Sequence, residues 1–168
     1  MSTSSTFYQR IKQTVAIPVR KAAALNVVLT GSWIQSELAH SMAPFDITPA
    51  QYNVMRILRG SHPESLHVLE IKDRMLDESP DITRLLDRLN KKGVISRRRS
   101  RSDRRVVEVF ISENGLELLS EMTPAVEDVF VQFGQLMTQE ELQDLSDKLD
   151  ALRSALPIVA TVELNESD

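Results

Sequence analysis

Arginine and lysine side chains, the groups in this chain best suited to bind a polyanion, are concentrated between Arg84 and Arg105. This stretch holds ten cationic side chains against two carboxylates, Asp87 and Asp103, and therefore carries a charge of +8. The whole chain of 168 residues has a net charge of −4, so the residues outside the stretch sum to −12. Such a separation of charge suits a protein in which one small surface binds a nucleic acid while the rest stays soluble.

A short helix is predicted at the start of this basic stretch. Ser79 is suited to cap the helix, Pro80 to occupy its first position, and Asp81 to interact with its positive N-terminal pole. Gly93 is suited to end it. One side of the helix carries the apolar positions Ile82, Leu85, Leu86 and Leu89. The opposite side carries the charged positions Arg84, Asp87, Arg88 and Lys91. The major groove of DNA admits such a helix, and arginine paired with guanine is the commonest specific contact there.

Beyond Gly93, β-prone residues predict two short strands, 94–98 and 106–111, joined by a turn rich in arginine and serine. A run of charge by itself is more often only a solvated surface. Here a cationic helix and a cationic hairpin adjoin, separated by a single glycine. The sequence therefore predicts a nucleic-acid-binding surface.

These segments resemble a known family. The run ITRLLDRLNKKGVISR, followed by SDRRVVEVFISENG, is similar to the recognition helix and wing of the multiple-antibiotic-resistance regulator (MarR) family of bacterial winged helix-turn-helix transcription factors. The resemblance implies a homodimer that binds double-stranded DNA at a pseudo-palindromic operator, more often as a repressor. It also implies that Arg105 at the wing tip enters the minor groove and that Asp103 helps to hold it in place. The residues expected to contact DNA are Thr83, Arg84, Arg88, Lys91, Arg97, Arg98, Arg99, Arg101, Asp103, Arg104 and Arg105.

The predicted fold is mostly α with a small β-hairpin wing, a winged helix-turn-helix with N- and C-terminal dimerisation helices. Residues 1–6 are expected to be a disordered tail, 7–45 the N-terminal dimerisation helices, 46–112 the DNA-binding lobe, 113–157 the C-terminal dimerisation helices and 158–168 an acidic tail. Within the lobe, Thr48 and Gln51 predict a capping box, and residues 66–76 a helix. Thr138 and Glu141 predict a second capping box at the start of the last helix. Pro124 leaves open whether the helix that contains it is one segment or two.

A small aromatic or phenolic ligand is a further expectation from the resemblance. Its candidate contacts are Trp33, His40, Tyr52 and Arg56, although such residues are more often plain core and rim. A zinc site needs ligands at short spacing with carboxylate support. Of the three histidines only His62 and His67 lie close together in the sequence, so solvated histidine side chains are favoured over a metal site.

Several classes of protein are disfavoured by the sequence. There is no cysteine, so a disulfide framework, a thiolate metal site and a cysteine redox switch are excluded. No catalytic or phosphate-binding motif is present, so neither an enzyme nor a cofactor is expected. The absence of a long apolar run predicts a cytoplasmic protein without a membrane partner. The alternative function is a winged-helix module whose basic face docks an acidic protein.

Overall fold

A computed structural model describes residues 10, 12, 17–76, 81–100 and 106–155. The predicted tails, 1–6 and 158–168, therefore lie outside the described residues, as does most of the segment before Ile17. The chain divides into two compact units, Met1–Val129 and Phe130–Asp168. The described residues are mostly helical with one small antiparallel sheet, which confirms the predicted fold class.

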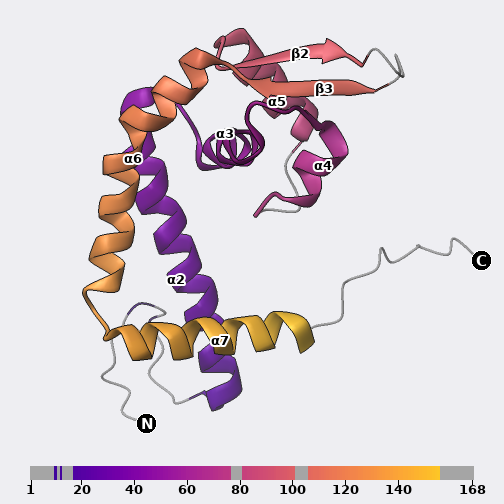
Figure 1. Cartoon of the computed structure of the whole chain (residues 1–168). Coiled ribbons are helices and arrows are strands. Elements are labelled where there is room, and N and C mark those ends of the chain that lie inside the picture. Colours follow the sequence, from indigo (N-terminus) through magenta and orange to yellow (C-terminus); the bar gives the residue numbers. More distant parts are fainter. Residues whose placement is uncertain (1–9, 11, 13–16, 77–80, 101–105, 156–168) are drawn as a thin grey trace, which may run out of the picture. The chain divides into compact units, whose positions relative to one another are not determined.

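The first long helix, α2, spans Val19–Met42 (Figure 1). It is followed by a short 3-10 helix, η1, at Ala43–Phe45. Only Ala22 and Met42 of α2 are buried, whereas large apolar side chains on it are exposed. The exposed ones are Val19, Leu25, Val27, Val28 and Trp33. Within the described part of the first unit, these side chains have no covering partner.

Helix α3 spans Pro49–Ser61 and confirms the predicted capping box. The Thr48 backbone N–H donates to Gln51 Oε1 at 3.0 Å, and the Gln51 backbone N–H donates to Thr48 Oγ1 at 3.3 Å. Two of the orphan donors at the start of the helix are thereby satisfied. The inner side of α3 is fully buried, so the helix forms the centre of the lobe.

The segment 66–76 was predicted to be one helix, and this prediction is wrong. Leu66–His67 form a short strand, β1, and the helix that follows, α4, spans only Val68–Asp73. The strand forms because Leu66 pairs with Val109 across the sheet. Leu69 and Leu76 are 72% and 88% exposed, so neither belongs to the core.

Helix α5 spans Ile82–Lys91 and ends as predicted at Gly93, which has a positive φ of 73°. Its start differs from the prediction, because Asp81 and not Ser79 is the N-cap. The Asp81 carboxylate accepts a hydrogen bond of 3.1 Å from the Arg84 backbone N–H, three residues along. The helix therefore begins two residues later than the sequence predicts, with Asp81 as its N-cap.

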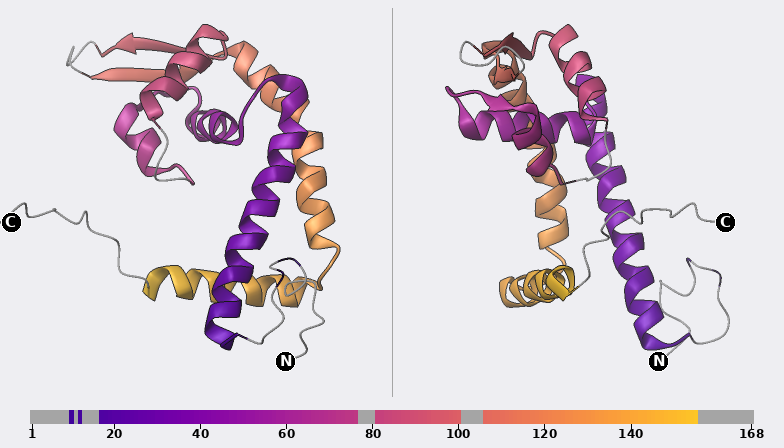
Figure 2. Two further views of the ribbon diagram at one scale, coloured as in Figure 1. Left: turned by 180° about the vertical axis from the view of Figure 1, so that it is seen from behind. Right: turned by 90° about the vertical axis from the view of Figure 1, so that its right-hand side faces the viewer.

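The wing strands are β2, Ile95–Arg99, and β3, Val107–Ile111. The sheet has the order β1-β3-β2, so the predicted two-stranded hairpin gains a third strand from the segment before α4. Figures 1 and 2 show β2 and β3 side by side, extending away from α6. Val109 of β3 is fully buried and joins the sheet to the core.

Helix α6 spans Glu113–Gly134 and contains Pro124 without interruption, which answers the question that the sequence left open. Its first half closes the core of the first unit. In the second unit, α7 spans Gln139–Ala155 and begins with the predicted capping box between Thr138 and Glu141. No helix in the described part of the chain combines the length and the apolar character that crossing a membrane requires.

The main core cluster of the first unit is one to which α3, α5, the sheet and α6 all contribute, and a small separate cluster surrounds Ala22 of α2. Its fully buried members include Met55, Leu58, Ile71, Leu86, Leu89, Val109, Leu119 and Met122. Because α5 and β3 are both attached to this cluster, the polar sides of the helix and the hairpin are held in a defined arrangement.

Candidate nucleic-acid interface

Helix α5 presents its two faces as the sequence predicted. Leu86 and Leu89 are buried, whereas Arg88 and Lys91 are exposed on the other side. Thr83 is also exposed. The leucines anchor the helix to the core, so the cationic side chains are directed to solvent.

Arg84 is exposed but has a neighbour on its own helix. Its Nε lies 3.2 Å from Asp81 Oδ2, the carboxylate that caps the helix. An ion pair between two exposed side chains stabilises little, typically about 0–1 kcal/mol. Breaking this contact so that Arg84 can bind a DNA base or phosphate therefore costs little free energy.

Arg97 on β2 joins the hairpin to α5. Its guanidinium donates to the carboxylate of Asp87, and the Arg97 side chain is only 26% exposed. The contact ties the first wing strand to the polar side of the helix. It also neutralises the one carboxylate on that side, which would otherwise repel phosphate.

Arg98 is held against the second wing strand. Its Nε donates to Glu108 Oε2 at 2.7 Å, and its guanidinium carbon lies 4.3 Å from the centre of the Phe110 ring. Hydrogen bonds from Arg98 and then from Ser100 lower the pKa of Glu108 below its ordinary value. Arg98 is thereby engaged by a carboxylate and an aromatic ring at once.

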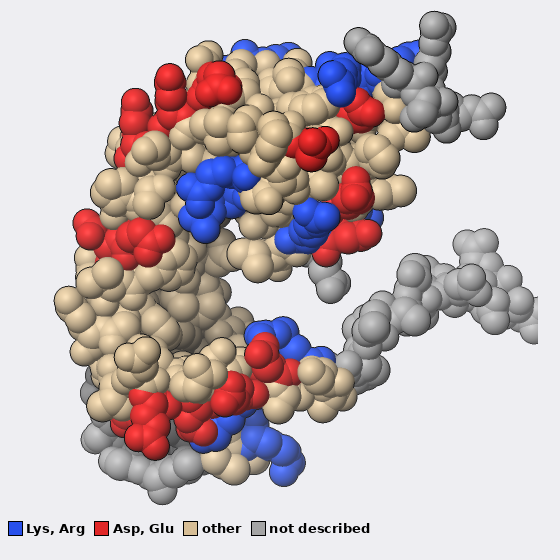
Figure 3. Space-filling model, viewed as in Figure 1, with Lys and Arg blue, Asp and Glu red and all other residues tan. Residues whose placement is uncertain are grey.

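Three described cations of the predicted site have side chains without an ion pair or a hydrogen bond to other described residues. They are Arg88, Lys91 and Arg99. All three are exposed, two on α5 and one at the end of β2. On the face drawn in Figure 3, Lys and Arg side chains lie over the β2–β3 hairpin, whereas Asp and Glu gather over α6. The arrangement can attract and contact a polyanion with cations that need not first leave a carboxylate.

Comparison with known proteins agrees with this geometry. The family model described as the MarR family matches residues 47–107. A MarR transcription factor of Planctomyces limnophilus is 31% identical, with a TM-score of 0.64 over 82% of this chain and 99% of that one. The HTH-type transcriptional repressor MdtR of Bacillus subtilis (strain 168) is 32% identical over 109 residues, which cover 65% of this chain and 69% of MdtR. The chain belongs to the MarR family.

The family membership makes this protein a transcriptional regulator and not an enzyme. A complex of MepR from S. aureus with DNA has the same fold, with a TM-score of 0.73 at 19% identity over 79% of this chain and 97% of that one. Within the described residues, no group of three or more His, Cys, Asp or Glu side chains could hold a metal ion.

The wing tip of this MarR-family regulator lies outside the described residues. It contains four of the predicted DNA contacts, namely Arg101, Asp103, Arg104 and Arg105. The strands that carry the tip, β2 and β3, are described, and their register pairs Arg99 with Val107. The roles of the four residues stay predictions.

The four ligand candidates of this regulator lie on α2 and α3, and the structure brings two of them into contact. Arg56 Nη1 donates to the Tyr52 hydroxyl at 3.3 Å, and the guanidinium carbon lies 5.9 Å from the ring centre. Tyr52 is buried, which fits a core residue with a polar tip. Trp33 and His40 lie exposed on α2.

One pair of residues near the interface was missed by sequence reasoning. The sequence places Lys92 in the basic stretch and indicates no role for Asp46. The Lys92 ammonium group binds both the carboxylate and the backbone carbonyl of Asp46. The two residues are 46 positions apart, so no spacing or motif could have shown that they meet.

Proposed function

We propose that this MarR-family regulator is a repressor that binds a pseudo-palindromic operator in duplex DNA as a homodimer, through α5 and the β2–β3 hairpin. The observation that carries the proposal is the set of three exposed cations whose side chains make no ion pair or hydrogen bond to other described residues. Arg88 and Lys91 stand on the side of α5 opposite its buried leucines, and Arg99 stands on the adjoining strand. A helix with such a face fits a major groove, and a basic hairpin beside it fits the flanking phosphates or the minor groove.

A homodimer is supported by apolar surface in each unit taken by itself. In the first unit, α2 exposes five large apolar side chains. In the second, Phe130, Val131, Leu136 and Leu152 are exposed. A self-complementary contact in a two-fold dimer would cover such surface. Sedimentation at micromolar concentration is expected to show a dimer, and a monomer would contradict the two-lobed arrangement.

Repression and release by a small aromatic ligand belong to the same proposal. The relative MdtR is named a repressor, which supports the sign of regulation. Release by a ligand rests on the family resemblance, with Trp33, His40, Tyr52 and Arg56 as its candidate contacts. A ligand acts as a switch only if it binds the DNA-competent and the released states with different affinity.

Selection of bound sites from a pool of random duplexes tests the proposed function. We expect enrichment of inverted repeats whose half-sites are about 10 bp apart, because two symmetry-related helices enter successive major grooves. A scrambled duplex of equal length is the control. Equal affinity for the selected and the scrambled duplex would contradict sequence-specific regulation and favour the alternative of a basic module that docks an acidic protein.

A wing-tip prediction follows from the family resemblance. Arg105→Ala is expected to weaken operator binding more than Arg101→Ala, although each removes one positive charge, because Arg105 is expected to enter the minor groove. Asp103→Ala is expected to weaken binding as well, because the carboxylate orders the arginine before DNA is bound. Titration of the selected operator at physiological salt measures all three. Tighter DNA binding by Asp103→Ala would show that net charge alone sets the affinity and that Asp103 has no positioning role.

A further inference from the structure

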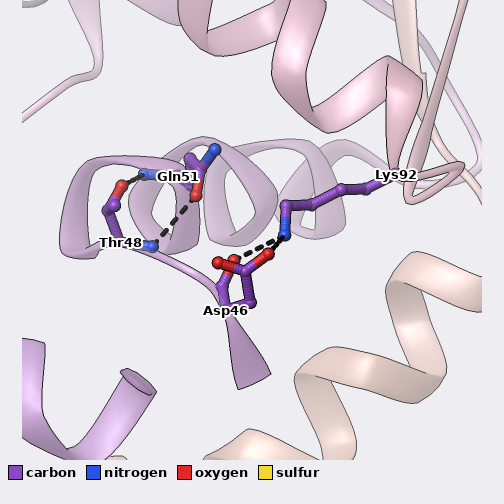
Figure 4. Close-up of polar contacts among 4 residues, drawn as sticks. All are labelled: Asp46, Thr48, Gln51 and Lys92. Carbon is purple, nitrogen blue, oxygen red and sulfur yellow. Dashed lines mark hydrogen bonds and ion pairs between the residues drawn. The ribbon is translucent and has the colours of Figure 1, made fainter. Parts of the chain in front are cut away.

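The end of α5 is tied to a distant part of the chain by one lysine. Lys92, the C-cap of the helix, extends its side chain to Asp46 (Figure 4). The ammonium group donates to the Asp46 backbone carbonyl at 2.6 Å and also to the Asp46 carboxylate. Two acceptors from one residue fix the position of the ammonium group more closely than a carboxylate alone would.

Asp46 occupies a defined place between helices. It caps the end of η1 with φ of 52° and ψ of 39°, a left-handed conformation in which Asp is one of the tolerated residues. The next residue, Ile47, is buried, and the capping box at Thr48 follows directly. Asp46 therefore directly precedes a segment that is anchored by the core at Ile47 and by the start of α3.

The charges at this contact are matched. The hydrogen bond from Lys92, together with its positive charge, lowers the pKa of Asp46 below its ordinary value of 3.8. The Lys92 side chain is 29% exposed and the Asp46 side chain is 95% exposed, so the contact lies at the surface and Lys92 is its more covered partner. Lys91, the preceding residue with the same charge, is exposed and has no such partner among the described residues. The two neighbouring lysines thus face different surroundings.

We propose that Lys92 is a positioning residue, which holds the end of α5 against the junction between η1 and α3 and does not bind phosphate. The proposal rests on the proposed DNA-binding function and deepens it. The junction is connected through η1 to the end of α2, the helix whose apolar surface is proposed to form the dimer. Lys92 therefore links the recognition helix to the end of a dimer helix, and a change at that end alters where the cations of α5 stand.

A double-mutant cycle in the full-length protein tests this role. The variants are Lys92→Ala, Asp46→Gly and the combination, since glycine adopts φ of 52° without strain and removes the Asp46 side chain while it keeps the backbone carbonyl. We expect each single variant to weaken operator binding about threefold to tenfold, and the combination to be no weaker than either single variant. Additive losses would overturn the proposal. Asp46→Asn, which also tolerates the left-handed conformation, is a second variant that checks the result if Asp46→Gly folds poorly.

Salt dependence separates positioning from phosphate contact. Lys91→Ala is the matched control, and in a dimer it is expected to make the slope of log K against log salt shallower by roughly 2. Lys92→Ala is expected to leave the slope of the wild-type protein unchanged. If Lys92→Ala made the slope as shallow as Lys91→Ala does, while Asp46→Gly bound normally, Lys92 would be a phosphate contact and the proposal would fall.

Hydrogen exchange in the protein without DNA tests the positioning role of Lys92 separately from the proposed DNA-binding function. The amides of Lys92 and Gly93 donate to the carbonyls of Arg88 and Asn90 at the end of α5. Lys92→Ala and Asp46→Asn are expected to speed exchange of these amides, whereas Lys91→Ala leaves it unchanged. If the wild-type protein bound no duplex from the random pool, the proposed function would fail. Hydrogen exchange of the Lys92 and Gly93 amides would still show whether the Lys92 side chain holds the end of α5. Unchanged exchange in both variants would overturn the positioning role.

Discussion

Replacing Gly115 by alanine is expected to lower the free energy of unfolding of the first compact unit by about 3 kcal/mol or more, at the upper end of the usual cost of overpacking a core. A Cβ atom at Gly115 would lie 2.1 Å from the carbonyl oxygen of Val94 and 2.8 Å from Cγ1 of Ile111. The nearer of these atoms belongs to the backbone at the start of the wing, so it cannot move aside as a flexible side chain can. The Val94 carbonyl also accepts a hydrogen bond from the Ser112 amide, which holds it in place.

Chemical denaturation of the full-length protein measures this effect. Gly60→Ala is the matched control, because a Cβ there meets nothing within 4 Å and the residue lies in α3. Alanine favours a helix over glycine by up to about 1 kcal/mol, so the control should be neutral or slightly stabilising. Equal stability of the two variants would show that α6 shifts without cost and that the close approach of Gly115 to Val94 is unimportant.

The combined variant Arg88→Ala and Lys91→Ala is expected to lose operator affinity by on the order of 100- to 1,000-fold near physiological salt. In a homodimer it removes four cations from the proposed interface. Each cation that neutralises a phosphate contributes about 0.9 to the slope of log K against log salt, so the slope should become shallower by roughly 3 to 4. Folding should be nearly unchanged, because both side chains are exposed and neither contacts another described side chain through an ion pair.

The control for this variant is the pair Lys148→Ala and Arg153→Ala. It removes the same charge from α7 in the second unit, where the two side chains pair with Asp144 and Asp150. Binding of the selected operator, measured at several salt concentrations, should be close to that of the wild-type protein. If both double variants lost the same affinity, net charge alone would explain the effect, and the proposal that α5 contacts the operator would be contradicted. If Arg88 or Lys91 contacts a base, the loss should be larger on the operator than on a scrambled duplex.

The sequence by itself determined the features that depend on residues three or four positions apart. The capping boxes at Thr48 and at Thr138 are of this kind, because both partners lie within one helical turn. The two faces of α5 and its end at Gly93 follow from the same short-range periodicity. The concentration of positive charge also needs no fold to be seen. These local features were enough to predict the family and the proposed interface.

Local signals also misled in two places. Ser79 and Pro80 favour a helix start, yet Asp81 caps α5, because its carboxylate accepts from Arg84 three residues along. Leucines at helical spacing predicted one helix for 66–76, yet strand pairing with β3 takes the first two residues. In the second case a partner more than 40 positions away decides the conformation, and the periodicity of the segment carries no information about it.

Only the tertiary structure decided which cations are already engaged. Arg97, Arg98 and Lys92 look the same in the sequence as Arg88, Lys91 and Arg99. The first three meet carboxylates brought close by the packing of α5, the sheet and the start of α3, and the last three do not meet any among the described residues. Gly115 is a similar case, since only the approach of the Val94 carbonyl makes its missing side chain necessary. The physical reason is that composition sets how much charge and apolar surface a chain carries, whereas the contacts between distant segments set where that charge remains available.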